Sequence, residues 1–485
     1  MDSINKKFEK TFGSLPEKVL QIGEGNFLRA FADWITESAN RQGMFNGSVV
    51  IAQPIEQGLC DLINSQNGMY TVLMRGVEGG KVVESFERVT SVSRCINPYQ
   101  NYNEFIEAAC LDTLEVIISN TTEAGIVYRD GDRADDAPPA SFPAKMTALL
   151  YARYKKFSGD PAKGLLILPV ELIERNGDNL RLIVLKYAGE WQLEPDFINW
   201  LENACCFANT LVDRIVTGYP HDEYFEISAI MGYEDKLLDT CEPFLFWVIE
   251  CDKKWAEKFP VDKIGMKIIF TDDMTPYRTR KVRILNGAHT VSVLLAYLCG
   301  HDIVLEMMND KLFSQYIEQA MFYEIIPTID LPEKELEFFA NAVLERFENP
   351  FIKHRLLDIS LNSVSKYKAR CLGSLLDYYS INKKVPPVLT FGLAALIFFY
   401  KGEFEGNHYI GMRGEEQYDI KDDIAVCEFM HVAWQTDDPA AAVLGNTSFW
   451  EQDLNLIPGL TAAVRKDLHD IHYKGARQAL KDFPI

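Results

Sequence analysis

The sequence lacks the features that mark a membrane-spanning or secreted protein. Its most apolar run, residues 388–400, is shorter than the roughly 20 residues that a transmembrane helix requires. Residues 1–18 are polar and contain no apolar segment typical of a signal peptide. The 10 cysteines include no CxxC spacing, so the pattern predicts neither a zinc ribbon nor a dithiol redox motif. We therefore expect a cytoplasmic protein with reduced thiols and no membrane partner.

Positive charge and histidine are also scarce. The chain has 49 Lys and Arg against 70 Asp and Glu, a net charge of -21, which argues against nucleic-acid partners. Only 8 histidines are present. The one close pair, His469 and His472, falls in a charged amphipathic pattern, which is typical of surface residues. We therefore predict no metal site.

The apolar content is sufficient for large cores. Hydrophobic residues make up 47% of 485 residues, a length that predicts two or three domains. In the first half, a buried strand at 18–23, an amphipathic helix at 26–43 and a strand at 48–52 predict a βαβ unit. Two further apolar runs predict parallel strands, and an alternating segment with two central glycines predicts a hairpin added to the sheet; these segments are 114–120, 164–170 and 69–92.

From about residue 275 the helical period dominates and strand signals nearly vanish. Residues 401–423 have no period and are rich in glycine and charge, which predicts a loop. The sequence therefore indicates an α/β protein with a Rossmann-like N-terminal domain, residues 1–272. A mainly α-helical C-terminal domain, residues 273–485, follows it.

A glycine turn links the first strand to the first helix. Gly23 and Gly25 are followed by Asn26 and Phe27 at the predicted helix start, while Leu28 stands where a dinucleotide fold has its third glycine. In such folds the second glycine lets the backbone approach the pyrophosphate at the helix N-terminus. A plain strand-to-helix turn explains the motif alone equally well. Its position in the βαβ unit favours cofactor binding.

Two other loops follow predicted strands. Glu56 is the nearest carboxylate after the second strand and mildly favours NAD over NADP, although its offset is unusual. Asn120 and Thr121 follow a later strand, at the edge that lines the ligand crevice of open sheets. An ordinary N-cap and turn cluster explains Thr121 nearly as well.

The segment 276-PYRTRKVRILNGAHTVSVLLAYL-298 carries polar residues on an otherwise apolar helix. If the helix is α throughout, at about 100° per residue, then Arg278, Lys281, Asn286 and His289 share one arc with apolar neighbours. The nearby arginine favours a neutral lysine, the form that a general base needs. Each residue alone has an ordinary explanation: a lysine that extends to solvent, an asparagine bonded back to its own helix and a core histidine with one partner. The shared arc favours a site.

These motifs resemble those of the polyol-specific long-chain (mannitol) dehydrogenase family. The K-x4-N-x2-H spacing of Lys281, Asn286 and His289 is similar to its signature, and the resemblance spans nearly the whole chain. With 21-QIGEGNFLRAF-31 and 119-SNTTEAG-125, the sequence is most similar to the tagaturonate reductase (altronate oxidoreductase) branch.

The resemblance implies hydride transfer to or from NAD (NADH) without a metal ion. It also implies that the active site lies between a Rossmann-like domain and a helical domain. It implies that Lys281 is the general acid/base, that Asn286 polarises the carbonyl and that His289 holds substrate hydroxyls. Val212 and Asp213 match a segment beside the nicotinamide. Lys366 and Arg370 align, less firmly, with a substrate-contacting helix.

Two departures from the mannitol-type pattern bear on the substrate. Leu172 stands where those members have an asparagine that donates to the oxyanion. The sequence does not identify the residue that donates in its place. Arg278 stands where they have a glutamate, and an arginine can pair with a carboxylate. We therefore expect a small-molecule sugar acid, the tagaturonate–altronate pair, bound by a monomer or small homo-oligomer. Fructuronate reductase, a neutral-polyol dehydrogenase and a non-catalytic dinucleotide sensor stay as alternatives.

Overall fold

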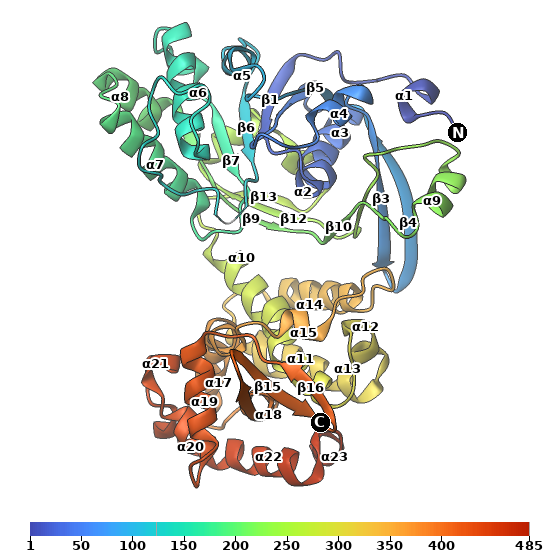
Figure 1. Cartoon of the computed structure of the whole chain (residues 1–485), viewed down its shortest axis with the longest axis vertical. Coiled ribbons are helices and arrows are strands. Elements are labelled where there is room, and N and C mark those ends of the chain that lie inside the picture. The colour runs from blue at the N-terminus through green and yellow to red at the C-terminus, as the bar shows by residue number, and fades with distance from the viewer. Residues whose placement is uncertain (123, 485) are drawn as a thin grey trace. The chain divides into compact units, whose positions relative to one another are not determined.

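The structure, a computed structural model, describes residues 1–122 and 124–484. The chain forms two compact units (Figure 1). Unit 1 comprises Met1–Gly76 and Val82–Met274, and unit 2 comprises the remainder from Thr275 together with the hairpin tip Val77–Lys81.

Unit 1 is built around a six-stranded sheet in the order β5-β2-β1-β6-β7-β8, with every neighbouring pair parallel. This arrangement confirms the predicted Rossmann-like α/β fold. Short apolar runs buried on both faces produce it, as expected for parallel strands. The strands are β1 (Glu17–Ile22), β2 (Ser48–Ala52), β5 (Val92–Ile96), β6 (Val116–Ser119), β7 (Leu166–Pro169) and β8 (Cys206–Phe207).

Alternate side chains of β1 enter two different cores. Val19 packs into one apolar cluster, and Leu20 and Ile22 pack into the other. The period of two along a strand explains this separation. Helices α6 (Phe142–Lys156), α7 (Asn176–Glu190) and α8 (Pro195–Ala204) contribute to the second cluster. The sheet is therefore covered on both faces (Figure 1).

The predicted hairpin exists but does not extend the parallel sheet, so that part of the prediction is wrong. It belongs to a separate four-stranded sheet in the order β10-β11-β3-β4. Asp235 anchors it, because its carboxylate accepts a hydrogen bond of 2.6 Å from the Thr71 backbone N–H. A third sheet has the order β13-β12-β9. The strands are β3 (Tyr70–Glu78), β4 (Lys81–Val89), β9 (Asn209–Asp213), β10 (Val216–Gly218), β11 (Asp239–Cys241), β12 (Phe246–Glu250) and β13 (Ile268–Thr271).

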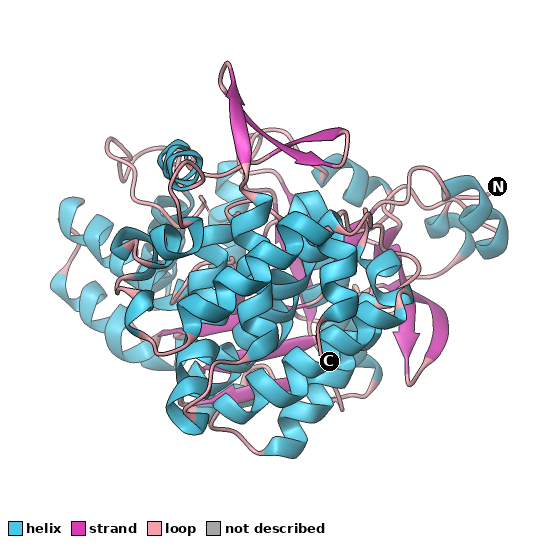
Figure 2. Cartoon of the chain, turned by 90° about the horizontal axis from the view of Figure 1, so that it is seen from below, coloured by secondary structure: helices cyan, strands magenta, loops and turns pink. Residues whose placement is uncertain are grey.

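Unit 2 is mostly helical, as Figure 2 shows in cyan. Its central helix α18 (Pro387–Phe399) is the most apolar run of the sequence and is buried along almost its whole length. Gly392 lets α18 approach α11 (Gly287–Leu298), because a Cβ at this position would lie 2.3 Å from Val291 Cγ2. Around them lie α13 (Lys311–Glu318), α14 (Glu333–Phe347), α16 (Ser363–Tyr367), α17 (Gly373–Asn382), α19 (Ile424–Ala433), α22 (Leu460–Lys474) and α23 (Ala476–Asp482).

The segment predicted as a loop at 401–423 contains a three-stranded antiparallel sheet instead. Gly406 and Gly414, at φ 61 and 63°, make its two tight turns. Tyr409 and Tyr418 are buried and donate to main-chain oxygens at 2.8 and 2.7 Å. The sequence pattern did not predict this sheet, because only a few of its side chains face the core and many of the others are charged. The strands are β14 (Gly402–Glu405), β15 (His408–Arg413) and β16 (Glu416–Asp419).

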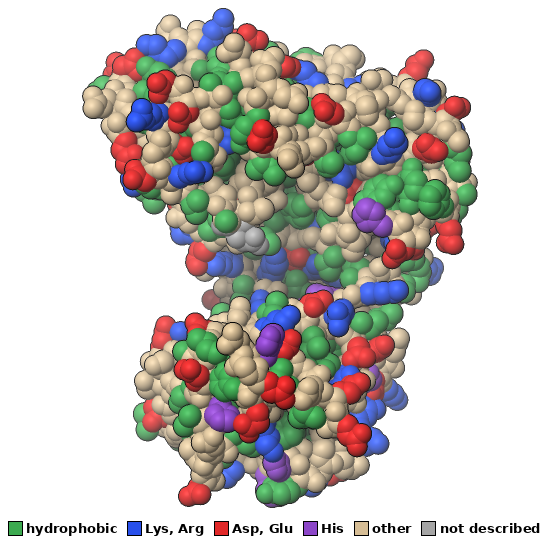
Figure 3. All heavy atoms as spheres, viewed as in Figure 1, with side chains coloured by type: hydrophobic (Ala, Val, Ile, Leu, Met, Phe, Trp, Pro, Cys, Tyr) green, Lys and Arg blue, Asp and Glu red, His purple; other side chains and the backbone are tan. Residues whose placement is uncertain are grey.

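Acidic and basic side chains are interspersed over the visible face of each unit (Figure 3). Within the part of the chain that the structure describes, no helix combines the length and apolar character needed to cross a bilayer.

Candidate active site

The two glycines of the first turn serve different purposes. Gly23 has φ 127°, and a Cβ there would lie 2.9 Å from the Asn120 carbonyl oxygen, so the fold itself requires glycine. Gly25 has an ordinary φ of -66°, and a Cβ there would meet no protein atom within 4 Å. The open space beside Gly25 fits a bound group such as a pyrophosphate.

A long helical segment begins directly after this turn. Asn26 is exposed at its start, and Phe27 is half-buried and stacked on Phe31, with ring centroids 4.9 Å apart. The sequence predicted a helix here, and the structure adds a π-helical stretch in its middle. The parts are α2 (Asn26–Leu28), η1 (Arg29–Asp33) and α3 (Trp34–Arg41).

The carboxyl ends of neighbouring strands meet at the glycine turn. Gly23 N–H donates to the Ala52 oxygen at 3.0 Å, and Asn120 N–H donates to the Ile22 oxygen at 3.1 Å. Parallel sheets bind ligands outside this edge. The structure therefore brings Gly23 and Asn120 together, as predicted for the crevice of the sheet.

The loop after β2 is held by Gln53, whose side-chain amide donates to the Ile55 and Glu56 oxygens at 2.8 and 2.9 Å. The Glu56 side chain is exposed. Gly58 permits a close approach, because a Cβ there would lie 2.2 Å from Glu24 Oε1. Burial raises the pKa of Glu24 above its ordinary value. Sequence reasoning missed both Glu24 and Gly58, since neither stands at a motif position.

Asn120 and Thr121 are tied to the end of β7. Asn120 Nδ2 donates to the Val170 oxygen at 3.1 Å, and the Thr121 hydroxyl and N–H both donate to Glu171 Oε1, at 2.9 and 3.0 Å. Glu171 is buried, and burial raises its pKa. These donors, predicted to serve a ligand, are thus engaged within unit 1 and shape the crevice edge. Leu172, next to Glu171, is 66% exposed and offers no side-chain donor.

Val212 and Asp213 are both buried at the end of β9. The strand lies beside the end of β7, because the Thr210 hydroxyl donates to the Pro169 oxygen at 2.5 Å. The structure thus places the predicted nicotinamide-side segment next to the carboxyl edge of the main sheet.

In unit 2, the helix that opens at Thr275 is not α-helical throughout, so the angular arithmetic for a continuous α-helix is wrong. It consists of α10 (Thr275–Arg280), a π-helical stretch η5 (Lys281–Asn286) and α11. A π-helix takes more residues per turn than an α-helix, so the shared arc computed at 100° per residue does not hold across η5. Such stretches are frequent at functional sites. Here the π-helical stretch begins at the predicted general base and ends at the predicted carbonyl-binding asparagine.

A second π-helical stretch, η8 (Lys368–Leu372), packs against this helix. Gly287 allows the approach, because a Cβ there would lie 3.3 Å from the Arg370 carbonyl oxygen. The Cys371 thiol donates to the Gly287 oxygen at 3.6 Å, and Arg370 Nη1 donates to the Thr290 hydroxyl at 3.3 Å. Arg370 therefore lies beside the turn that carries His289.

His289 is held as a neutral ring. It stacks on Phe347 with ring centroids 4.1 Å apart and an interplanar angle of 10°. Burial, followed by the charges of His354, Arg346, Arg370 and Lys366, keeps its pKa well below the ordinary value. Its buried Nε2 atom makes no hydrogen bond to any described residue.

The residues around His289 form a cationic cluster, defined as Arg346, His354, Lys366 and Arg370. Burial and the Arg370 charge lower the pKa of Lys366, whose Nζ donates to the Ile359 oxygen at 2.8 Å. Burial and then the Lys366 charge lower the pKa of His354, while Asp358 opposes the shift. Four cationic or protonatable groups around one neutral histidine favour an anionic ligand.

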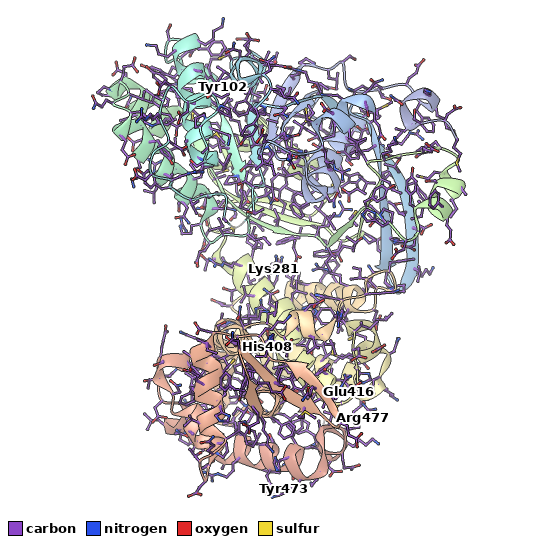
Figure 4. The ribbon with its side chains drawn as sticks, viewed as in Figure 1. Tyr102, Lys281, His408, Glu416, Tyr473 and Arg477 are labelled. Atoms are coloured by element: carbon purple, nitrogen blue, oxygen red, sulfur yellow. The ribbon has the colours of Figure 1, made fainter. Side chains whose placement is uncertain are left out.

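Lys281, Asn286 and Arg278 are each half-buried on the same helical segment, and Figure 4 labels Lys281. Arg283 turns to another side, where it pairs with Asp377 at 2.7 Å. The structure thus gathers His289, Lys366 and Arg370, and it places Lys281 and Asn286 at the two ends of η5. Sequence reasoning missed His354 and Arg346, because no spacing connects them to the helix.

Over residues 1–122 and 124–484, no three His, Cys, Asp or Glu side chains are grouped so that they could hold a metal ion.

Two family profiles match this sequence. The mannitol dehydrogenase Rossmann domain matches residues 17–263, and the mannitol dehydrogenase C-terminal domain matches residues 273–472. Altronate oxidoreductase of Escherichia coli O7:K1 (strain IAI39 / ExPEC) is 45% identical over 475 residues, 96% of each chain. Altronate oxidoreductase of Shigella flexneri matches to the same extent.

Two solved structures share the fold. Pseudomonas fluorescens mannitol 2-dehydrogenase, in a ternary complex with NAD and D-mannitol, is 22% identical with a TM-score of 0.68, covering 97% of this chain and 95% of that one. D-sorbitol dehydrogenase in substrate-free form is 19% identical with a TM-score of 0.81, covering 97% and 96%. The predicted resemblance is confirmed: this chain belongs to the mannitol dehydrogenase family of oxidoreductases.

Proposed function

We propose that this chain is an NAD-dependent oxidoreductase that interconverts D-tagaturonate and D-altronate. The observation that carries the proposal is 45% identity, across 96% of both chains, to proteins named altronate oxidoreductase. Membership of a dehydrogenase family favours an enzyme over a non-catalytic dinucleotide sensor, and the cationic cluster in unit 2 favours an acid over a neutral polyol.

NAD is the cofactor, and the open space at Gly25 supports its place in unit 1. Gly23 makes the turn, Gly25 admits the pyrophosphate, and Asn26 and Phe27 open the helix whose N-terminus faces it. Glu56, in the exposed loop after β2, binds the adenosine ribose. Asn120, Thr121, Val212 and Asp213 form the crevice edge on the nicotinamide side. When bound as NADH, the cofactor supplies the hydride.

The residues of unit 2 act on the substrate carbonyl oxygen and on the proton that this oxygen gains on reduction. Asn286 donates a hydrogen bond to the substrate carbonyl oxygen, which stabilises the negative charge that develops on it. Lys281 in its ammonium form then gives that oxygen a proton, and in the oxidative direction its neutral amine removes the hydroxyl proton. His289, neutral and with a free Nε2, accepts or donates at a substrate hydroxyl without adding charge.

The carboxylate of the substrate is bound by cationic side chains. Lys366 and Arg370 are half-buried beside His289, and Arg278 lies one turn before Lys281. A planar guanidinium can bind a carboxylate through two parallel hydrogen bonds. This set of cations supports a sugar acid as substrate.

A substrate panel tests the proposal. We would follow oxidation of NADH and of NADPH by the purified chain with tagaturonate, fructuronate and fructose. We expect the highest kcat/KM with tagaturonate and NADH. A higher value with fructuronate would assign the chain to mannonate formation, and a higher value with fructose would refute an acid substrate.

A further inference from the structure

Cys206 and Cys251 lie together in unit 1, although 45 positions separate them in the sequence. Cys206 begins β8, the edge strand of the parallel sheet, and its N–H donates to the Leu165 oxygen at 2.9 Å. Cys251 directly follows β12, and its N–H donates to the Thr271 oxygen at 2.9 Å. Both side chains pack against the same apolar core. Strand β9 pairs with β12 so that Asn209 lies opposite Glu250. Cys206 and Cys251 therefore lie at the same end of this strand pair, where both line one hollow.

The pair is accessible from solvent. Both cysteines are half-buried and line a surface hollow of about 470 Å³. Charged side chains of both signs surround the hollow, among them Arg175, Asp178 and Lys254. A small, charged, water-soluble reagent can therefore reach either sulfur.

The surroundings of Cys206 disfavour its thiolate. Interaction with Cys251, followed by burial, raises the pKa of the Cys206 thiol. Since the thiolate is the nucleophile in thiol–disulfide exchange, we assign the first attack to Cys251.

We propose that Cys206 and Cys251 form a redox-active dithiol site that low-molecular-weight disulfides such as glutathione disulfide convert to an intrachain disulfide. The Cys251 thiolate attacks one sulfur of glutathione disulfide, which releases one glutathione thiolate and leaves a mixed disulfide on Cys251. The Cys206 thiol then loses its proton and attacks the Cys251 sulfur, which releases the second glutathione. Two protein thiols are oxidised, one glutathione disulfide is reduced to two glutathione molecules, and the two protons pass to the released thiolates.

The site lies where the chain leaves unit 1. Glu250, next to Cys251, accepts hydrogen bonds from Asn209 Nδ2 at 3.0 Å and from the Met274 N–H at 2.8 Å. Met274 is the last residue of unit 1. A disulfide between Cys206 and Cys251 therefore links β8 to the end of β12, next to the last residue of unit 1. We expect this link to stabilise unit 1.

A second cysteine pair provides an internal control. Cys60 and Cys95 also interact, but both side chains are at most 5% exposed, and Asn64 contacts both residues. Because a disulfide reagent must reach a sulfur to react, this pair is expected to stay reduced while Cys206 and Cys251 are oxidised.

The test is a peptide map of the full-length protein after incubation with glutathione disulfide, digested without reductant. We expect a cross-linked species two hydrogen masses below the reduced peptides, with fragmentation assigning the bond to Cys206 and Cys251, and dithiothreitol reversing it. Cys251→Ser removes the species, whereas Cys95→Ser and Cys205→Ser retain it. The oxidised protein should melt on the order of 5 °C higher, because the bond closes a loop of roughly 45 residues.

The wild-type map decides the question even if a variant fails to fold. A bond that joins Cys205 to Cys251, or glutathione found only as separate adducts on Cys206 and Cys251, would overturn the proposal. Equal oxidation of Cys60 and Cys95 would also overturn it, since accessibility would then not select the pair.

Discussion

The two glycines of the first turn provide a matched pair of substitutions with opposite expected effects. In Gly25→Ala the added methyl group meets no protein atom within 4 Å at a φ of -66°, so the free energy of unfolding should change by less than about 0.5 kcal/mol. If the pyrophosphate occupies that space, the methyl group displaces it. We expect a loss of NADH affinity of at least tenfold, or about 1.4 kcal/mol.

Gly23→Ala should show the reverse pattern. Its φ of 127° and a Cβ 2.9 Å from the Asn120 oxygen cost about 1–3 kcal/mol of stability, which lowers Tm by roughly 5 °C for a unit of this size. Thermal unfolding and NADH fluorescence titration of both variants measure the two quantities. Wild-type NADH affinity in a normally folded Gly25→Ala protein would refute the placement of the pyrophosphate.

Three further predictions concern charge. Lys366→Met should raise KM for tagaturonate by about 10–100-fold, because it removes a hydrogen bond to a charged group, and should raise KM for fructose less. Lys368→Met is the control. Lys368 pairs with Glu451 at 2.8 Å, so this substitution should leave KM unchanged. Arg278→Glu should weaken tagaturonate use selectively, and an unaltered KM would contradict its role with the carboxylate. Burial raises the pKa of Asp33 from 3.8 to about 7. The free energy of unfolding of the wild-type protein should therefore fall by a few kcal/mol, relative to that of Asp33→Asn, as pH rises from 4 to 7. A difference between the two proteins that stays the same at every pH in denaturation experiments would contradict this.

The sequence predicted β1, β2, β6 and β7 of the main sheet because these strands are short apolar runs with turn residues between them. It did not predict β5 and β8, which complete the sheet. It failed for the hairpin, since alternation along residues 69–92 shows that strands exist but not which sheet they join. It failed again at 401–423, where few side chains are buried, among them Tyr409, Tyr418 and Ile420, and the surrounding charge resembles that of a loop.

The candidate site was partly predictable for similar reasons. The Lys281, Asn286 and His289 spacing is visible in the sequence, but only the structure shows that residues Lys281–Asn286 are π-helical and pack against η8. His354 and Arg346 reach His289 only through tertiary structure. Gly23 and Gly25 look alike in sequence, and only the structure shows that the fold requires Gly23 and that Gly25 leaves open space.

Lys281 is the residue proposed to perform the proton transfer in an NADH-dependent reduction of tagaturonate. The most direct test is to measure turnover and NADH affinity of Lys281→Ala on the same preparation. We predict that kcat falls by about 10²–10⁴-fold, the usual contribution of a general acid or base, while the Kd for NADH stays within twofold of wild type. Wild-type turnover in this variant would contradict the role of Lys281 as the general acid/base.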